Sequence, residues 1–374
     1  MSQRDLLKKW REKSAATSRQ IEPAPVETKV RPTSGQQRLW TLQQLQPRNP
    51  FYQYAHVFHI TGEVNPLTFE RAVDELMARH DILRANFIDD EAELELVVRP
   101  LKAGLLHFEG VRFNKAQAEA KLQLLALTPY DLAHDSLFRA HLAEVGNGAW
   151  QLILAMHHII GDRSSLMVLK NELFRIYSQL KDGKVSSTYS ESSICFRDYA
   201  YWRNKQKPSE EAISYWKAQL AGQIPVPSLP VDCRRPDAPT YGGGSLIVAL
   251  DDDLSSAIRT HAQALDMTAN VYFLAAFKVW LSRYGSESDI CVGSPVSLRD
   301  RRQLEHTVGF MNETLALRSQ LPQEVVWEDA LETVKNTFTE AFARKEVEFQ
   351  RVVEEVLPAE VQNKNPFFQH MFVF

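Results

Sequence analysis

Cysteine is scarce in this chain. Only three cysteines occur among 374 residues, at positions 195, 233 and 291, and no two of them have CxxC spacing. Scattered cysteines of this kind are typical of proteins from a reducing compartment. They also give little support for a zinc site, which needs three or four ligands close together. We therefore expect a cytoplasmic protein without a bound metal.

Long apolar runs are also lacking, and so is a strong excess of charge. No stretch approaches the roughly 20 apolar residues of a membrane helix, and residues 1–20 are basic and polar, unlike a signal peptide. The net charge is −4, too small to indicate a nucleic acid or a membrane surface as a partner. With 44% hydrophobic and 24% charged residues, the composition predicts a globular protein, and the length accommodates two domains.

The most informative motif is a pair of histidines followed by an aspartate. His157 and His158 end an alternating apolar stretch that runs from Trp150 to Met156 and predicts a strand. Asp162 then precedes leucines at helical spacing. If the strand continues through the pair, one imidazole faces a cleft and the other packs behind the sheet. Strand ends that lead into helices are common places for chemistry in α/β proteins.

Three interpretations of this cluster are open at this point. The histidines could be structural, with Asp162 as the N-cap of the helix. They could bind a metal, but further ligands are hard to find, because His56 and His59 form an HxxH pair that would lie on opposite faces of a strand. Alternatively, one histidine could act in acid–base or polar catalysis, since imidazole titrates near neutral pH.

Composition divides the chain into four parts. Residues 1–30 are predicted to be a basic tail, with an excess of four positive charges in the first 20 residues, followed by a proline-rich extended linker. Residues 31–221 form an N-terminal lobe that contains the histidine motif. The proline- and glycine-rich stretch 222–243 is predicted to link it to a C-terminal lobe at 244–374.

Both lobes mix strand and helix patterns, which predicts an α/β protein. The tail is expected to form a short helix, and another helix is expected to begin at Asn65-Pro66. Further helices are expected near 115–125, after Asp162, and near 194–206, 209–221, 254–265, 268–284, 327–343 and 346–356. Strands are expected near 52–60, 82–88, 94–99, 138–144, 150–157, 245–250, 289–296, 313–317 and 367–374. The last of these is strongly apolar and stops at the final residue, as in a truncated chain.

Several short motifs, taken together and in order, resemble those of condensation domains of nonribosomal peptide synthetases. The resemblance runs from about Ser34 to the end of the chain. It rests on Ser34–Trp40, Arg79–Phe87, Pro129–Leu132, Leu137–Ala140, His157–Asp162 (similar to the HHxxxDG signature), Phe196–Trp202, Val308–Thr314 with Arg318, and Asn365–Gln369. The family usually continues past the last motif. Each motif alone is weak, but their shared order makes a chance match very unlikely.

The resemblance implies two lobes like chloramphenicol acetyltransferase, arranged as a V with a central tunnel. The implied reaction joins a donor acyl or peptidyl thioester to an acceptor aminoacyl thioester as an amide. Carrier domains would supply both substrates on 4'-phosphopantetheine arms, so that no cofactor is bound directly, and an adenylation domain would be adjacent. Residues 1–20 could also dock onto an upstream synthetase chain.

The resemblance also assigns roles to individual residues. His158 would be the base or would orient the attacking amine, with His157 beside it. Asp162 would pair with the distant Arg299 and hold the loop, which is compatible with a role as N-cap. Asn312 would position a substrate amide or brace the tunnel, although an ordinary turn residue is an equal alternative.

One position departs from the signature. Arg163 stands where the family usually has glycine, so its side chain either narrows the substrate channel, contacts a carboxylate or phosphopantetheine group, or points to solvent. Gly161 is expected to supply some of the lost backbone freedom.

Two other classes of function compete with this one. The first is a related enzyme: a starter domain that acylates with a fatty acid, an epimerising relative, or another acyltransferase that uses a carrier or coenzyme A. The second is a non-catalytic recruitment module of the same fold, against which the retained histidines argue. Heterocyclisation is disfavoured because the paired aspartates of cyclising relatives are not found.

Overall fold

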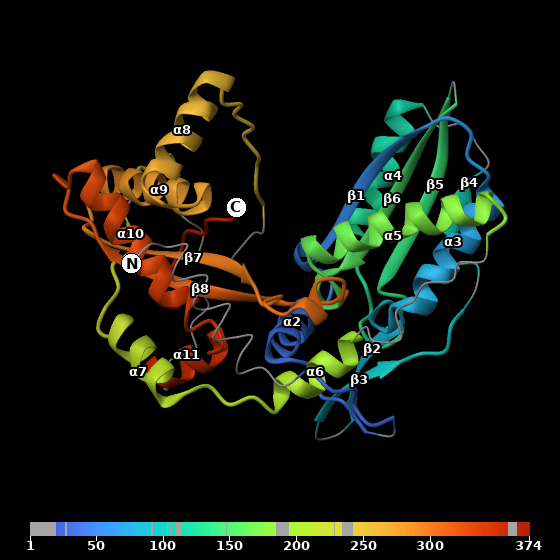
Figure 1. Ribbon diagram of the computed structural model, residues 1–374, viewed down its shortest axis with the longest axis horizontal. Coiled ribbons are helices and arrows are strands. Elements are labelled where there is room, and N and C mark those ends of the chain that lie inside the picture. The colour runs from blue at the N-terminus through green and yellow to red at the C-terminus, as the bar shows by residue number, and fades with distance from the viewer. Residues whose placement is uncertain are drawn as a thin grey trace. The chain divides into compact units, whose positions relative to one another are not determined.

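The computed structural model describes residues 20–374 except 27, 91–92, 103, 105, 110–113, 147, 185–193, 228, 234–241 and 358–364. The chain forms two compact units (Figure 1). The histidine unit comprises Arg19–Gln206 together with the short segment Arg299–Met311, and the C-terminal unit comprises Lys207–Leu298 and Asn312–Phe374. The helix expected in residues 1–20 lies outside the described residues.

The histidine unit is built on a four-stranded sheet with the order β1-β6-β5-β4. The strands are β1 (Gln53–Thr61), β4 (Leu106–Glu109), β5 (Phe138–Gly146) and β6 (Ala149–His157), and all pairings are antiparallel except β4 with β5. Its helices are α2 (Ser34–Leu45), α3 (Pro66–Arg79), α4 (Lys115–Leu127), α5 (Arg163–Lys181) and α6 (Phe196–Asn204). A separate hairpin joins β2 (Ala85–Asp90) to β3 (Glu93–Val98).

The central strand β6 is apolar on both faces because helices cover both. Ile153 and Ala155 pack with Leu125 of α4. Leu152 and Leu154 alternate with them and are fully buried, and α3 and α5 lie side by side over the sheet (Figure 1). A strand between two helical layers has no polar face, as expected for buried strands.

Most expected elements are confirmed within a few residues. Asn65 caps α3 with Pro66 at the first helical position, and Asp162 caps α5. Two elements were not expected, namely β4 and α2. Helix α2 buries two glutamines and a single leucine, so it lacks the apolar stripe that identifies a helix in the sequence.

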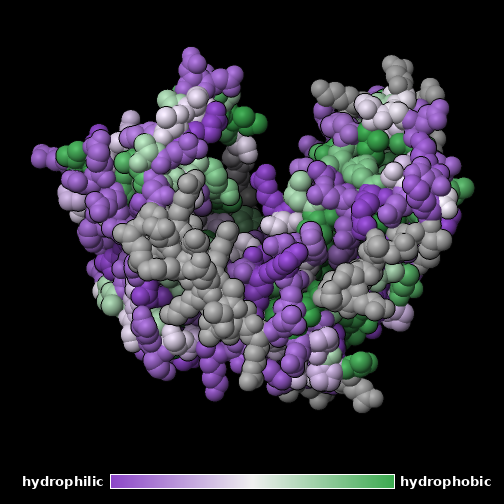
Figure 2. Space-filling model, viewed as in Figure 1, coloured by the Kyte–Doolittle hydropathy of each residue, from purple (hydrophilic) through white to green (hydrophobic). Residues whose placement is uncertain are grey.

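Three expected strands need correction. Residues 82–84 belong to a 3-10 turn, Asp81–Arg84, so that β2 begins only at Ala85. Residues 245–250 form no strand and expose Leu246 and Ile247 by 90% and 93%; Figure 2 shows hydrophobic surface beside α8, along the course of this segment.

The strand expected at 367–374 is reduced to a single bridge, in which Gly293 bonds the backbone of His370 and Phe372. In the two segments at 245–250 and 367–374 the apolar pattern is present, but the described structure pairs no further backbone with them.

The N-terminal linker also differs from expectation. Residues 20–30 pack against the histidine unit, where Ile21 and Val30 are 2% exposed and Val30 bridges to Leu96. The segment is extended, as its prolines require, but it is held in place and is therefore part of the unit.

The C-terminal unit contains a two-stranded antiparallel sheet of β7 (Asp289–Ser297) and β8 (Asn312–Gln320). Its helices are α7 (Glu210–Gln219), α8 (Asp252–Ala264), α9 (Ala269–Gly285), α10 (Trp327–Phe342) and α11 (Phe349–Val356). The division between the units falls at residue 206, before α7, because α7 packs on α11; the sequence had suggested a division at 222–243. Among the described residues, no helix is long and apolar enough to cross a membrane.

A lysine lies in the core of the C-terminal unit. Lys278 of α9 is 0% exposed, and its Nζ donates to Ser319 Oγ at 2.7 Å. Burial lowers the pKa of this amine to about 7, against smaller opposing effects of Cys291 and Asp289.

This lysine should make stability depend on pH. Between pH 7 and about 10.5 the unfolded chain binds a proton that the folded chain lacks, so stability should rise with pH by up to about 1.4 kcal/mol per unit. Lys278→Met should remove this rise and stabilise the protein at neutral pH. Urea unfolding at several pH values measures it, with the exposed Lys207→Met as control. Equal slopes for wild type and Lys278→Met would contradict the assignment.

Candidate active site

The two histidines lie where β6 ends and a turn begins. The strand stops at His157, and His158 starts a 3-10 turn that runs to Ile160. The strand therefore does not continue through the pair. The two rings point in different directions because the chain turns at His158, and not because side chains alternate along a strand. His157 is 1% exposed, whereas His158 is half-buried. The expected division into one packed and one accessible imidazole is present.

His157 is held as a neutral structural ring. Its Nδ1 accepts the backbone N–H of Ile159 at 3.1 Å, which leaves Nε2 as the donor to Gln43 Oε1 at 3.4 Å. Burial, with a smaller contribution from His158, lowers the pKa of His157 to about 3. The ring is therefore uncharged at neutral pH.

Helix α2 supports this turn with its buried glutamines. Gln36 Nε2 donates to the carbonyl of Ile159 at 2.9 Å, and Gln43 meets His157 as described. Both side chains are almost completely buried. Helix α2, which contains the first motif, therefore holds the histidine turn through hydrogen bonds. The sequence of the motif did not indicate this role.

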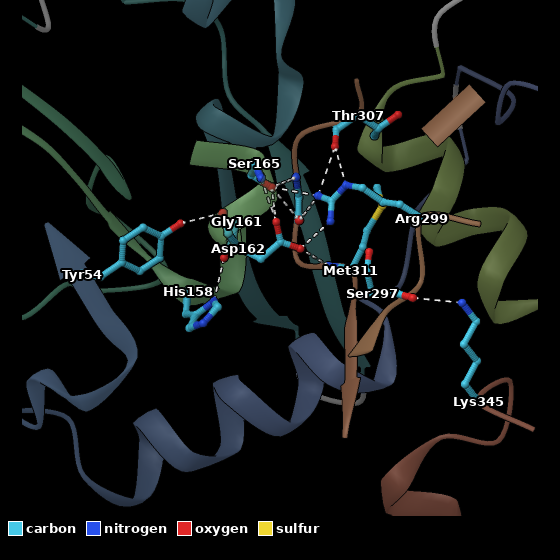
Figure 3. A network of polar contacts seen from close by, with 11 residues as sticks. Tyr54, His158, Gly161, Asp162, Ser165, Ser297, Arg299, Thr307, Met311 and Lys345 are labelled. Atoms are coloured by element: carbon cyan, nitrogen blue, oxygen red, sulfur yellow. Dashed lines mark hydrogen bonds and ion pairs between the residues drawn. The ribbon is translucent and has the colours of Figure 1, made fainter. Parts of the chain in front are cut away.

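His158 is fixed in the tautomer that leaves Nε2 free of a proton. Its Nδ1 lies 2.7 Å from the carbonyl oxygen of Gly161 (Figure 3). Because a carbonyl only accepts, Nδ1 carries the hydrogen and Nε2 presents a lone pair. The rings of Tyr54 and Phe310 contact the imidazole at centroid distances of 5.4 and 5.2 Å, each edge to face. The ring is thus oriented, and Nε2 can accept a hydrogen bond or a proton.

Gly161 is needed for space rather than for backbone freedom. Its φ is −172°, an extended conformation that any residue adopts. A Cβ at this position would lie 2.8 Å from Met156 Sδ and 3.4 Å from Ser165 Cβ. The expectation of conformational freedom is therefore corrected: a larger residue would have to displace the side chain of Met156.

Asp162 uses its two carboxylate oxygens for two different tasks. Oδ1 accepts the backbone N–H and the hydroxyl of Ser165, both at 2.8 Å, and so caps α5. Oδ2 accepts Arg299 Nη1 at 2.6 Å and the backbone N–H of Met311 at 3.2 Å. The side chain is 1% exposed. The expected ion pair and the N-cap are both present.

Arg299 belongs to a segment that we call the latch, Arg299–Met311. The latch follows β7 and precedes β8, but by its contacts it is part of the histidine unit. Besides Asp162, the guanidinium donates to the carbonyl of Thr307 at 3.2 Å (Figure 3). It also donates to the carbonyl of Gly309 at 3.0 Å. The ion pair is therefore a loop-anchoring one within this unit.

A glycine lets the latch approach α6. Gly309 has a φ of +156°, and a Cβ here would lie 1.7 Å from the Phe196 ring. Phe196 opens the fourth motif and Gly309 belongs to the fifth, so the two motifs pack on each other next to Phe310, which contacts His158.

The remaining expected residues lie apart from this cluster. Arg163 is the first residue of α5 and is exposed, which fits the solvent-facing alternative. Asn312 begins β8 opposite Ser297 in the C-terminal unit, and its role stays a prediction. No group of three or more histidine, cysteine or acidic residues able to hold a metal is present in the part of the chain that the structure describes.

Two further residues of the site were not expected from the sequence. The Tyr54 hydroxyl donates to the carbonyl of Asp162 at 3.2 Å, and burial raises its pKa, so the phenol stays protonated. The Ser165 hydroxyl lies within hydrogen-bonding distance of Asp162, Arg299 and Gly309. Ser165 stands three residues after the N-cap Asp162. Residues at that position often bond the N-cap residue, so the sequence could have indicated its contact with Asp162.

Breaking the buried ion pair should destabilise the histidine unit. Asp162→Ala or Arg299→Ala strands one charge in a buried site, which typically costs about 3–5 kcal/mol. The double variant should lose less than the sum of the two, as a double-mutant cycle of unfolding free energies would measure. The exposed pair Lys29–Asp90 serves as control and should show little coupling. Coupling near zero for Asp162 and Arg299 would contradict their pairing.

The neutral His157 should make the protein sensitive to acid. Between pH 6.5 and about 3 the unfolded chain gains a proton on His157 that the folded chain does not, so stability should fall as pH falls, by up to about 1.4 kcal/mol per unit. His157→Gln should flatten the dependence of unfolding free energy on pH over this range. The exposed His306→Gln is the control. An unchanged pH slope in His157→Gln would show that another group is responsible.

Comparison with known proteins gives a consistent result. One of the linear gramicidin synthase proteins of Brevibacillus parabrevis is 32% identical over 96% of this chain, and malpibaldin synthetase of Mortierella alpina is 31% identical over 91%. The chain spans only 5% and 6% of the length of these relatives.

Solved structures with the same fold include the X-domain from teicoplanin biosynthesis, with a TM-score of 0.83 at 22% identity, covering 94% of this chain and 79% of that one. A first condensation domain of the CDA synthetase matches with a TM-score of 0.72 at 20% identity, covering 87% and 78%. The expected mixed fold, like that of chloramphenicol acetyltransferase, is thereby confirmed. Residues 26–374 match the family model described as Condensation domain. This chain is therefore a member of the condensation domain family of nonribosomal peptide synthetases.

Proposed function

We propose that this chain forms an amide bond between two thioester-bound substrates. The donor is an acyl or peptidyl thioester, the acceptor is an aminoacyl thioester, and carrier domains hold both on 4'-phosphopantetheine arms. The observation that carries the proposal is the fixed tautomer of His158, whose Nε2 presents a lone pair beside two aromatic rings. A general base or an amine-orienting acceptor has to offer this atom.

The proposed reaction needs little from the protein beyond placement. The acceptor amine attacks the donor carbonyl, a C–N bond forms, and the C–S bond breaks as the thiolate leaves. His158 Nε2 accepts the proton that the amine loses, and this proton then passes to the departing sulfur. Thioesters are reactive and a free amine is a fair nucleophile, so orientation accounts for most of the barrier. A base contributes about 10²–10⁴-fold.

The other residues support His158 in this proposal. Gly161 holds Nδ1 through its carbonyl, and Asp162 with Arg299 fixes the ends of the turn and the latch. His157 stays uncharged, so it does not compete for the proton. Asn312 is proposed to meet a substrate amide rather than the reacting atoms, and Arg163 is proposed to face solvent. An adenylation domain and an upstream synthetase chain complete the proposed set of partners.

Starter-type acylation is the second candidate. A variant of the starter condensation domain of rhizomide synthetase, in complex with C8-CoA, has a TM-score of 0.78 to this chain at 19% identity and covers 92% of it and 78% of that chain. A fatty acyl donor would use the same aminolysis and the same acceptor atom on His158. Only the donor differs, so the two candidates are separated by the donor that reacts.

Recruitment is the third candidate. The X-domain from teicoplanin biosynthesis is also known in a complex with OxyB, so a domain of this fold can bind another protein. The retained and oriented His158 favours catalysis over recruitment for this chain.

His158→Ala should abolish amide formation and leave folding nearly unchanged. The half-buried ring makes one side-chain hydrogen bond to Gly161, whereas the reaction loses its base or orienting group, a loss of about 10²–10⁴-fold. The assay incubates carrier domains loaded with a panel of aminoacyl, acetyl and octanoyl thioesters, and detects the product on the acceptor carrier by mass spectrometry. The exposed His134→Ala is the control.

Each outcome of this assay separates the candidates. Products from aminoacyl donors support condensation, and products only from octanoyl donors support the starter type. A folded His158→Ala protein that condenses at the wild-type rate would contradict the active-site assignment. A wild-type chain that forms no amide with any donor would favour recruitment.

A further inference from the structure

The segment before the first helix is fastened to the histidine unit by several main-chain contacts. We call Ile21–Val26 the strap. Ile21 is 2% exposed and Ala24 is 6% exposed, although Val26 at the end of the strap is 93% exposed. The strap is therefore held at a few separate residues. The hydrogen bonds of its main chain show which residues these are.

Helix α6 supplies one of these points through two charged side chains. The Arg197 guanidinium donates to the carbonyls of Pro25 and Val26 at 2.7 and 3.1 Å, and also to those of Ala24 and Thr28. Asp198 Oδ1 accepts the backbone N–H of Ala24 at 2.7 Å. Charge-assisted bonds of this kind are stronger than neutral ones, so Arg197 and Asp198 of the fourth motif bind the main chain of the strap firmly.

The latch supplies the other point through a single amide. Gln303 Oε1 accepts the backbone N–H of Ile21 at 3.1 Å, and Gln303 Nε2 donates to the carbonyl of the same residue at 3.3 Å. One side chain therefore satisfies both main-chain groups of Ile21. Gln303 lies in the 3-10 turn Arg302–Leu304, in the middle of the latch.

From Gln303 a short path of bonded groups leads to the catalytic turn. The Thr307 hydroxyl lies between two carbonyl acceptors, that of Ile194 at 2.9 Å and that of Gln303 at 3.2 Å, and the carbonyl of Thr307 accepts Arg299 Nη2 at 3.2 Å. Arg299 in turn holds Asp162, and Phe310 at the far end of the latch rests on the His158 ring. The latch is thus held at the strap on one side and touches the imidazole on the other.

We propose that Gln303 is a positioning residue for His158, acting by tying the strap to the latch. The inference rests on the proposed function, because one of its tests measures the kcat of amide formation. Without the amide, Ile21 loses both partners and the turn Arg302–Leu304 loses its tether. The latch then samples other positions, and Phe310 and Arg299 orient the histidine turn less sharply.

The first experiment compares Gln303→Ala with Glu305→Ala, an exposed neighbour in the same segment. Hydrogen exchange of the full chain should become faster in peptides covering 299–311 and 157–162 for Gln303→Ala, and should stay at the wild-type rate for Glu305→Ala. With the best thioester pair from the panel above, kcat should fall, by up to about 100-fold, while KM for both carriers is unchanged. A purely structural role would lower thermal stability without lowering kcat at an unchanged KM.

Two further variants test whether the strap is the partner. Gln303→Glu keeps the acceptor for the Ile21 N–H but loses the donor. The hydrogen-exchange rate of residues 299–311 and the kcat of this variant should therefore be intermediate between those of wild type and Gln303→Ala. Deleting residues 1–22 removes Ile21 and should reproduce the Gln303→Ala effect. Combining this deletion with Gln303→Ala should add nothing, whereas deletion of residues 1–18 should leave the latch unchanged.

The outcomes separate this inference from the proposed function. Unchanged exchange of 299–311 in Gln303→Ala would overturn the tether. Faster exchange with an unchanged kcat would overturn the positioning role. A wild-type chain without amide-forming activity would count against the proposed function, and the exchange comparison would still decide whether strap and latch are connected.

Discussion

The buried ion pair between Asp162 and Arg299 is the interaction on which the site depends. One oxygen of Asp162 begins helix α5, and the other receives the latch through Arg299 and the backbone of Met311. The two charges are almost fully desolvated, at 1% and 7% exposed, so their energy comes from complete hydrogen bonding rather than from attraction alone. A histidine turn between two such anchors has little freedom to move.

The two adjacent histidines show how one motif gives two roles. His157 is buried and hydrogen-bonded at both nitrogens, so it is neutral and rigid. Among the described residues, His158 is bonded at Nδ1 only, through Gly161, and is packed by rings on two sides. Burial and hydrogen bonding, rather than the residue type, decide which imidazole is structural and which can accept a proton.

The sequence was sufficient to predict the fold class and most helices and strands, and its resemblance to the family predicted the pairing of Asp162 with Arg299. It was not sufficient where structure depends on partners distant in the chain. Residues 245–250 carry a strand pattern, yet no strand of the described backbone pairs with them. The strap has the composition of a linker, but Arg197 and Gln303 bind its main chain, which no side-chain pattern encodes. Similarly, Gly161 is required for space, a property visible only after Met156 is placed.

The central claim is that His158 presents a bare Nε2 while Gly161 holds the proton on Nδ1. Nitrogen-15 NMR of the imidazole side chains in the full chain at about pH 8, well above the ordinary imidazole pKa, reads the tautomer of each ring directly once a His158→Gln variant has assigned the signals. The account predicts a proton on Nδ1 of His158 and on Nε2 of His157, because their partners are a carbonyl and a backbone N–H respectively. A proton on Nε2 of His158 at that pH would contradict it.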